Sequence, residues 1–113
     1  MFDPFEMTWF QFDNLIKGRV PFLLINHGAE LSNIYNGFYQ TQLNSLTQTI
    51  SPQQVAQYLA ENKIPTHHAI LILCPNGEES KKSKELIESL GFSNVFYHRE
   101  GLTGLLADRA RYS

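Results

Sequence analysis

Cys74 is the only cysteine in the chain, and its surroundings form the clearest chemical pattern in the sequence. Five apolar residues, 69–73, lead straight into it, and the six residues 75–80, PNGEES, connect it to a helical pattern. A loop that leads into a helix supplies backbone N–H groups and the positive end of a helix dipole, and both favour a thiolate over a thiol. We therefore predict a functional role for Cys74. The alternative is a small buried hydrophobe at a strand end.

The loop after Cys74 contains residue types that suit a turn holding an anion. Gly77 is predicted to adopt the positive φ that such a loop requires. Ser80 has two interpretations, a residue that starts the helix or a hydroxyl that lines a pocket. His98 and Arg99 follow a later strand and either border this pocket or are exposed polar residues. The predicted loop consists of Pro75, Asn76, Gly77, Glu78, Glu79 and Ser80.

Local patterns predict the helices that hold this loop. Thr8 with Gln11, and Ser51 with Gln54, have capping-box spacing, and a proline follows Ser51 at the first helical position. A third helix is predicted over residues 80–90, and a short one closes the chain. Residues 27–50 are predicted to be irregular, with a brief helix at 30–35. The apolar stripe of the third helix is predicted to consist of Ser83, Leu86, Ile87 and Leu90.

Three apolar segments between these helices predict strands, at residues 21–26, 69–73 and 94–98. The segment 69–73 lacks polar alternation, as expected of a strand covered on both faces. Strands that alternate with helices predict a three-layer α/β/α fold with a mostly parallel central sheet. Ligands of such sheets bind beyond the carboxyl ends of the strands, which is where Cys74 is predicted to lie.

Length and charge narrow the class of protein. A chain of 113 residues predicts one domain, 1–113, in which residues 1–7 form an N-terminal arm. Aromatic residues near this end are predicted to lie in the core or in a packed arm: Phe2, Phe5, Trp9 and Phe10. The net charge of −2 argues against a general binder of nucleic acid or of membrane surfaces.

The location and the cofactor requirement are also predicted from composition. No apolar run is long enough for a membrane span, and the first ten residues lack the basic region of a secretory signal. A single cysteine fits a reducing compartment, so we predict a cytoplasmic protein. The adjacent pair His67-His68 has no metal-ligand spacing, so no metal site is predicted.

The order of these pieces resembles the rhodanese-like domain. That family carries a cysteine that opens a loop of the form C-R-x-G-x-R, often followed by a serine, and Cys74, Gly77 and Ser80 match this frame. The segment SLGFSNVFYHREGL, residues 89–102, resembles the family pattern xxGFxNVxxLxGGx. FLLIN, at 22–26, resembles the family strand xLIDVR, and NGF, at 36–38, lies where the family often has Gly-His-Ile. The resemblance covers most of the chain.

The resemblance implies sulfur transfer through Cys74. In that chemistry a cysteine thiolate attacks a sulfane-sulfur donor, becomes a persulfide and passes the sulfur to a nucleophilic acceptor. Backbone N–H groups can hold the anionic sulfur, so neither a metal nor an organic cofactor is implied. The implied partner is a sulfur donor, either a small molecule or a protein persulfide.

The loop departs from the family in its charge. Pro75 and Glu79 stand where active members have arginines, and Pro75 has no N–H to offer. Glu78 and Glu79 disfavour a thiolate and repel a dianion such as thiosulfate. They are either first-turn acids that complement the helix dipole, or groups that select a cationic or protein-bound donor. Lys81, Lys82 and Arg99 could restore positive charge.

Two further departures lie outside the loop. The family's Asp-x-Arg at the end of the first strand is Asn26-His27-Gly28 here, so that ion pair is absent, and Glu100 replaces the first glycine of the family's Gly-Gly. Two hypotheses remain: a sulfurtransferase or persulfide carrier, and a catalytically degenerate module that binds a protein partner. A related phosphatase would need the arginine of C-x5-R, which is Ser80 here.

Overall fold

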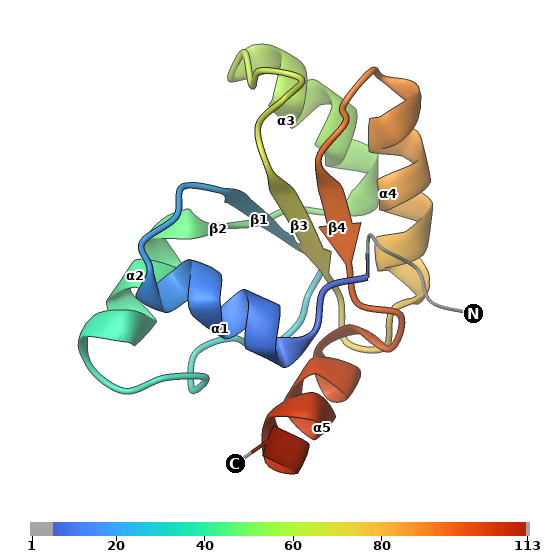
Figure 1. The fold of residues 1–113 in the computed structure, drawn as a ribbon. Coiled ribbons are helices and arrows are strands. Elements are labelled where there is room, and N and C mark those ends of the chain that lie inside the picture. The colour runs from blue at the N-terminus through green and yellow to red at the C-terminus, as the bar shows by residue number, and fades with distance from the viewer. Residues whose placement is uncertain (1–5, 113) are drawn as a thin grey trace.

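The computed structural model describes residues 6–112 and contains a four-stranded sheet between two layers of helices (Figure 1). The strand order is β2-β1-β3-β4, and every pairing is parallel. This confirms the predicted three-layer α/β/α fold. The strands are β1 (Leu23–Asn26), β2 (Thr47–Thr49), β3 (Ile70–Leu73) and β4 (Val95–Tyr97).

The helices cover the two faces of the sheet. One face carries α1 (Trp9–Lys17), α2 (Phe38–Leu46) and α5 (Gly101–Tyr112), and the other carries α3 (Val55–Glu61) and α4 (Glu78–Ser89). Leu71 and Leu73 of β3 pack in the first core cluster, and Ile70 and Ile72 pack in the second. All four residues are buried, as a strand without polar alternation predicts.

Both predicted capping boxes form. The Thr8 side chain accepts from the backbone N–H of Gln11 at 3.4 Å, and the Gln11 side chain accepts from the Thr8 N–H at 2.9 Å. The Gln54 side chain accepts from the Ser51 N–H at 2.9 Å. The first turn after Ser51, η1 (Pro52–Gln54), is a 3₁₀ turn that leads into α3.

The prediction for residues 27–50 was wrong. No helix lies at 30–35, and this region instead contains α2 and β2. The Glu30 carboxylate accepts from the N–H and the hydroxyl of Ser32, and the Gln40 amide bonds to Tyr35 N and Leu31 O. These side-chain bonds hold the segment before α2 in turns. The sequence TQT of β2 is polar because β2 is an edge strand.

Several predicted core positions are exposed. Phe10 is 63% exposed, although its neighbour Trp9 is buried; Phe2 and Phe5 lie outside the described residues. On α4, Ser83 and Ile87 are buried as predicted. The other two members of the predicted stripe, Leu86 and Leu90, are 40% and 46% exposed, because α4 faces the sheet over a narrower arc than its apolar pattern suggested.

The chain changes direction across the sheet between β1 and β3. It runs from β1 through α2 to β2 on one side, and then through α3 to β3 on the other side of β1. The carboxyl ends of β1 and β3 therefore flank a topological switch point, where ligands of open α/β sheets bind. Cys74 follows β3 directly at this point. Within residues 6–112, no helix has the length and apolar character needed to cross a membrane.

Candidate active site

The sulfur of Cys74 is surrounded by hydrogen-bond donors. The backbone N–H of Gly77 lies 3.0 Å from Sγ, the N–H of Ser80 lies 3.4 Å away, and the Ser80 hydroxyl oxygen lies 3.1 Å away. All three come from the loop and the first turn of α4, whose positive dipole end points the same way. Together they form a cradle that stabilises negative charge on sulfur.

Two glycines allow this loop to pack tightly. Gly77 has φ +94° and is the N-cap of α4, which confirms the predicted positive φ; a Cβ there would overlap the carbonyl oxygen of Arg99. Gly101 has φ +63°, and a Cβ there would overlap the carbonyl oxygen of Cys74. The corner between β4 and α5 therefore lies backbone to backbone against the cysteine loop.

The first turn of α5 is bonded to the backbone of the cysteine loop. The N–H of Leu102 donates to the Cys74 carbonyl at 2.8 Å, and the N–H and hydroxyl of Thr103 donate to the Pro75 carbonyl at 3.3 Å and 3.0 Å. Cys74 and Ser80 are both 0% exposed. A reagent can therefore reach the sulfur only after the chain around it moves.

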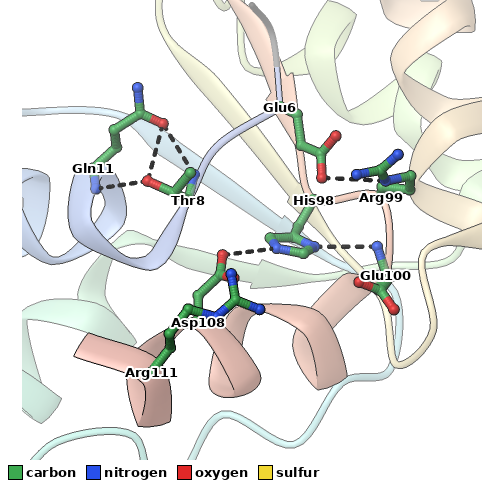
Figure 2. Close-up of polar contacts among 8 residues, drawn as sticks. All are labelled: Glu6, Thr8, Gln11, His98, Arg99, Glu100, Asp108 and Arg111. Atoms are coloured by element: carbon green, nitrogen blue, oxygen red, sulfur yellow. Dashed lines mark hydrogen bonds and ion pairs between the residues drawn. The ribbon is translucent and has the colours of Figure 1, made fainter. Parts of the chain in front are cut away.

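His98 holds α5 in place (Figure 2). It is 4% exposed, and its Nδ1 accepts from the backbone N–H of Glu100 at 3.1 Å. The ring proton must therefore lie on Nε2, which donates to the Asp108 carboxylate at 3.1 Å. His98 thus joins the end of β4 to the middle of α5 and does not line the pocket described next. The His98–Asp108 contact is called the clasp below.

An open pocket of about 520 Å³ lies beside the loop. Three of its lining residues are cationic, and Glu78 and Glu85 are anionic. Arg99 lines this pocket, which does not include Cys74; its side chain is 71% exposed and lies 3.5 Å from the Glu6 carboxylate (Figure 2). Exposed Glu79 is not among the lining residues. The pocket is lined by Asn76, Gly77, Glu78, Lys81, Lys82, Glu85, Tyr97 and Arg99.

Solved structures with the same fold exist. A rhodanese-like domain of the Anabaena protein Alr3790 superposes with a TM-score of 0.66 at 13% identity, over 94% of this chain and 75% of that one. A rhodanese-like domain protein from Staphylococcus aureus gives 0.63 at 16% identity, over 88% and 89%. The fold is rhodanese-like. An uncharacterized protein from Saccharomyces cerevisiae has a TM-score of 0.62 at 7% identity, with 98% of both chains covered. No family model and no curated protein matches the sequence.

The rhodanese-like fold places Asn26 and His27 at the end of β1, next to the cysteine loop. Asn26 closes a turn onto Ala29, whose N–H donates to its side chain at 2.8 Å and whose carbonyl accepts at 2.9 Å. His27 bonds through both ring nitrogens, to the Ile50 carbonyl and to Ser83, at 2.7 Å each. For this segment, only the absence of the family's ion pair was predicted. One sequence signal could have identified His27 as a candidate site residue: it is a titratable side chain directly after a predicted strand.

Metal ligands do not gather in this rhodanese-like fold. Among the described residues, no group of three His, Cys, Asp or Glu side chains is close enough to hold a metal ion. His67 and His68 lie before β3, at the end of the sheet opposite Cys74. The chemistry available at the switch point is therefore that of a thiol held by N–H and O–H donors.

Proposed function

We propose that the protein is a sulfurtransferase that carries sulfane sulfur as a persulfide on Cys74. The observation that supports this most is the set of donors from Gly77 and Ser80 around Sγ. A structural cysteine that only fills space needs no such donors, whereas a sulfur that carries charge does. Its position at the switch point of a rhodanese-like fold supports the same conclusion.

The reaction has two balanced steps. The Cys74 thiolate attacks the terminal sulfur of a donor persulfide, R–S–S⁻; the donor S–S bond breaks, a new S–S bond forms on Cys74, and the donor leaves as the thiolate R–S⁻. A thiolate acceptor then attacks the outer sulfur and regenerates the Cys74 thiolate. Charge remains on sulfur throughout, so the cradle serves both steps, and no metal or organic cofactor is needed.

The donor is proposed to be protein-bound rather than thiosulfate. Pro75 offers no N–H, and Glu78 places a carboxylate on the pocket beside the loop. A donor protein can obtain binding energy from contacts away from the reacting atoms, so it is less sensitive to this charge. A single thiol used in this way also fits a reducing compartment, and we propose a cytoplasmic location.

Steady-state sulfur transfer tests this proposal. Wild type is compared with Cys74→Ser, and with Pro75→Arg/Glu79→Arg, using thiosulfate and a desulfurase persulfide as donors. Wild type should use the persulfide donor better, Cys74→Ser should be inactive, and the arginine variant should gain kcat/KM for thiosulfate by about tenfold per 1.4 kcal/mol of transition-state stabilisation. Equal activity of wild type and Cys74→Ser with both donors would refute the proposal.

A second candidate function has its own support. Cys74 is 0% exposed, and the pocket beside the loop is lined by residues that do not include it. A module that has lost catalysis and binds a protein partner needs no access to the thiol. The two candidates differ in one result: a degenerate module never accumulates a persulfide, even with a donor in excess.

A further inference from the structure

His27 lies next to Cys74 at the carboxyl ends of the two central strands. Asn26 is the register partner of Leu73, and the His27 N–H donates to the Leu73 carbonyl at 2.8 Å, so His27 is opposite Cys74. Neighbouring strands are about 4.8 Å apart. Ile25 and Ile72 both pack in the core under α3 and α4, so the side chains of His27 and Cys74, two residues later on each strand, face α4 as well.

The imidazole of His27 is fixed from both sides. Its Nδ1 lies 2.7 Å from the Ile50 carbonyl, which can only accept, so Nδ1 carries the proton of the neutral ring. Its Nε2 therefore accepts from the hydroxyl of Ser83, also at 2.7 Å. Ser83 is 2% exposed, so this contact lies inside the protein, between the end of β1 and the second turn of α4.

Ser83 and Ser80 are three residues apart on α4 and share one face of the helix. Ser80 provides two of the three donors to the Cys74 sulfur, at 3.4 Å from its N–H and 3.1 Å from its hydroxyl. The bond from His27 to Ser83 therefore holds α4 at a point one turn after the donors of Ser80. The same strand end that carries His27 is bonded to β3 one residue before Cys74.

We propose that His27 is a positioning residue for Cys74, acting through Ser83 to hold the first turn of α4 against the sulfur. The inference rests on the proposed function, which needs that turn to keep its donors on a charged sulfur through both steps. His27 stands within the segment that lacks the family's Asp-x-Arg, and it links β1 to α4 by hydrogen bonds instead.

Two substitutions of His27 test the bonds of its two ring nitrogens one at a time. His27→Asn places an amide near Nδ1, so it can keep the bond to Ile50 but loses Ser83. His27→Gln places an amide oxygen near Nε2, so it can still accept from Ser83. Ser83→Ala removes the same contact from the helix side. Ser89→Ala, an exposed serine of α4 bonded only to the Leu86 carbonyl, is the matched control.

The first readout is the rate at which a persulfide donor loads Cys74. His27→Asn and Ser83→Ala should each lower the maximal loading rate about tenfold with little change in donor saturation, and His27→Gln should recover much of the loss. The double variant His27→Asn/Ser83→Ala should be no slower than either single variant, because the two substitutions remove the same contact. Val55→Ala is a control for lost stability, because Val55 packs in the core cluster that contains Ile25 and Ile72. It should lower Tm without slowing the loading of folded protein.

The second readout does not depend on activity. The amide signals of Gly77 and Ser80 in NMR spectra report their bonds to sulfur. Both should move in His27→Asn and in Ser83→Ala and remain unchanged in Ser89→Ala. Unchanged signals in the first two variants would overturn the positioning role. If wild type never loads sulfur but the signals move as expected, the proposed function fails while the positioning of α4 by His27 stands.

Discussion

A charged sulfur inside a protein depends on its donors, and Ser80 provides two of the three at Cys74. The sequence left two interpretations of this serine open, helix start or pocket hydroxyl. In the structure Ser80 lies in the first turn of α4, and its hydroxyl points at Sγ. This hydroxyl is the one side-chain donor among the three, and hydrogen bonds to charged groups contribute about 1.5–3 kcal/mol.

Removing that hydroxyl tests its contribution. Ser80→Ala should slow persulfide loading of Cys74 by at least about tenfold, because the hydroxyl is lost while the backbone N–H remains. Stopped-flow or quenched loading kinetics give the rate, with Ser89→Ala as the control on the exposed side of the same helix. A loading rate equal to wild type in Ser80→Ala would show that the hydroxyl contributes nothing to the charged state.

Gly77 is a second residue-scale test. Gly77→Ala requires an L-residue at φ +94° and also forces a Cβ into the Arg99 carbonyl, whereas Gly28→Ala has φ +90° with open space around it. Gly28→Ala should cost about 1–2 kcal/mol, the usual penalty of the left-handed region. Gly77→Ala should cost at least about 2 kcal/mol more, because backbone must move. Urea unfolding measures both, and equal costs would contradict the close approach.

At the scale of elements, α5 is anchored to the backbone of the cysteine loop. Its first turn donates to the Cys74 and Pro75 carbonyls, and the clasp between His98 and Asp108 holds its middle against β4. These contacts are local, so the loop and α5 can separate without unfolding the sheet. Reaction at Cys74 is expected to follow this separation.

Weakening the clasp should therefore expose the thiol. Asp108→Ala leaves the buried His98 N–H without its acceptor and should speed alkylation of Cys74 in native buffer several-fold. Arg111→Ala is the control, because Arg111 is 69% exposed and lies 3.9 Å from Asp108, a surface pair that contributes little. Mass spectrometry follows the modification. α5 would have no part in keeping the loop closed if Asp108→Ala reacted no faster than Arg111→Ala.

The segment before α2 gives a pH test at the same scale. Burial raises the pKa of Tyr35 above its ordinary value of 10.0, and the hydrogen bond to Asp13 raises it further. The folded state therefore keeps the phenol neutral while the unfolded state ionises, so its stabilisation is complete below that value and decreases as pH rises above it. Tyr35→Phe should lose this alkaline dependence. The free energy of unfolding of Tyr35→Phe and of wild type is measured with urea at pH values below and above 10.0.

Elements that depend on local signals could be predicted from the sequence. The capping boxes at Thr8 and Ser51 and the apolar run of β3 identify their own elements, and Gly77 marks its own positive φ. The elements α2 and β2 could not be predicted in this way. The polar residues of β2 form a strand only because β1 offers an edge, and residues 30–35 form turns because of bonds from Gln40.

At the scale of the whole molecule, the sheet order decides which residues meet. His27 is far from Cys74 and Ser83 in the chain and meets them because β1 and β3 are neighbours under α4. The position of Cys74 at the carboxyl end of a central strand was predictable from the alternation of elements. The bond from His27 to Ser83 was not, because it depends on register between β1 and β3 and on the rotation of α4.

The central claim is that Cys74 carries sulfur, and intact mass tests it most directly. Wild type and the control variant Cys74→Ser are each incubated with a cysteine-desulfurase persulfide system and desalted. The intact mass of each protein is then measured by mass spectrometry before and after cyanide treatment. We expect a gain of one sulfur atom on wild type that cyanide removes and that Cys74→Ser never acquires. An unchanged mass of wild type with excess donor, or the same gain on Cys74→Ser, would contradict it.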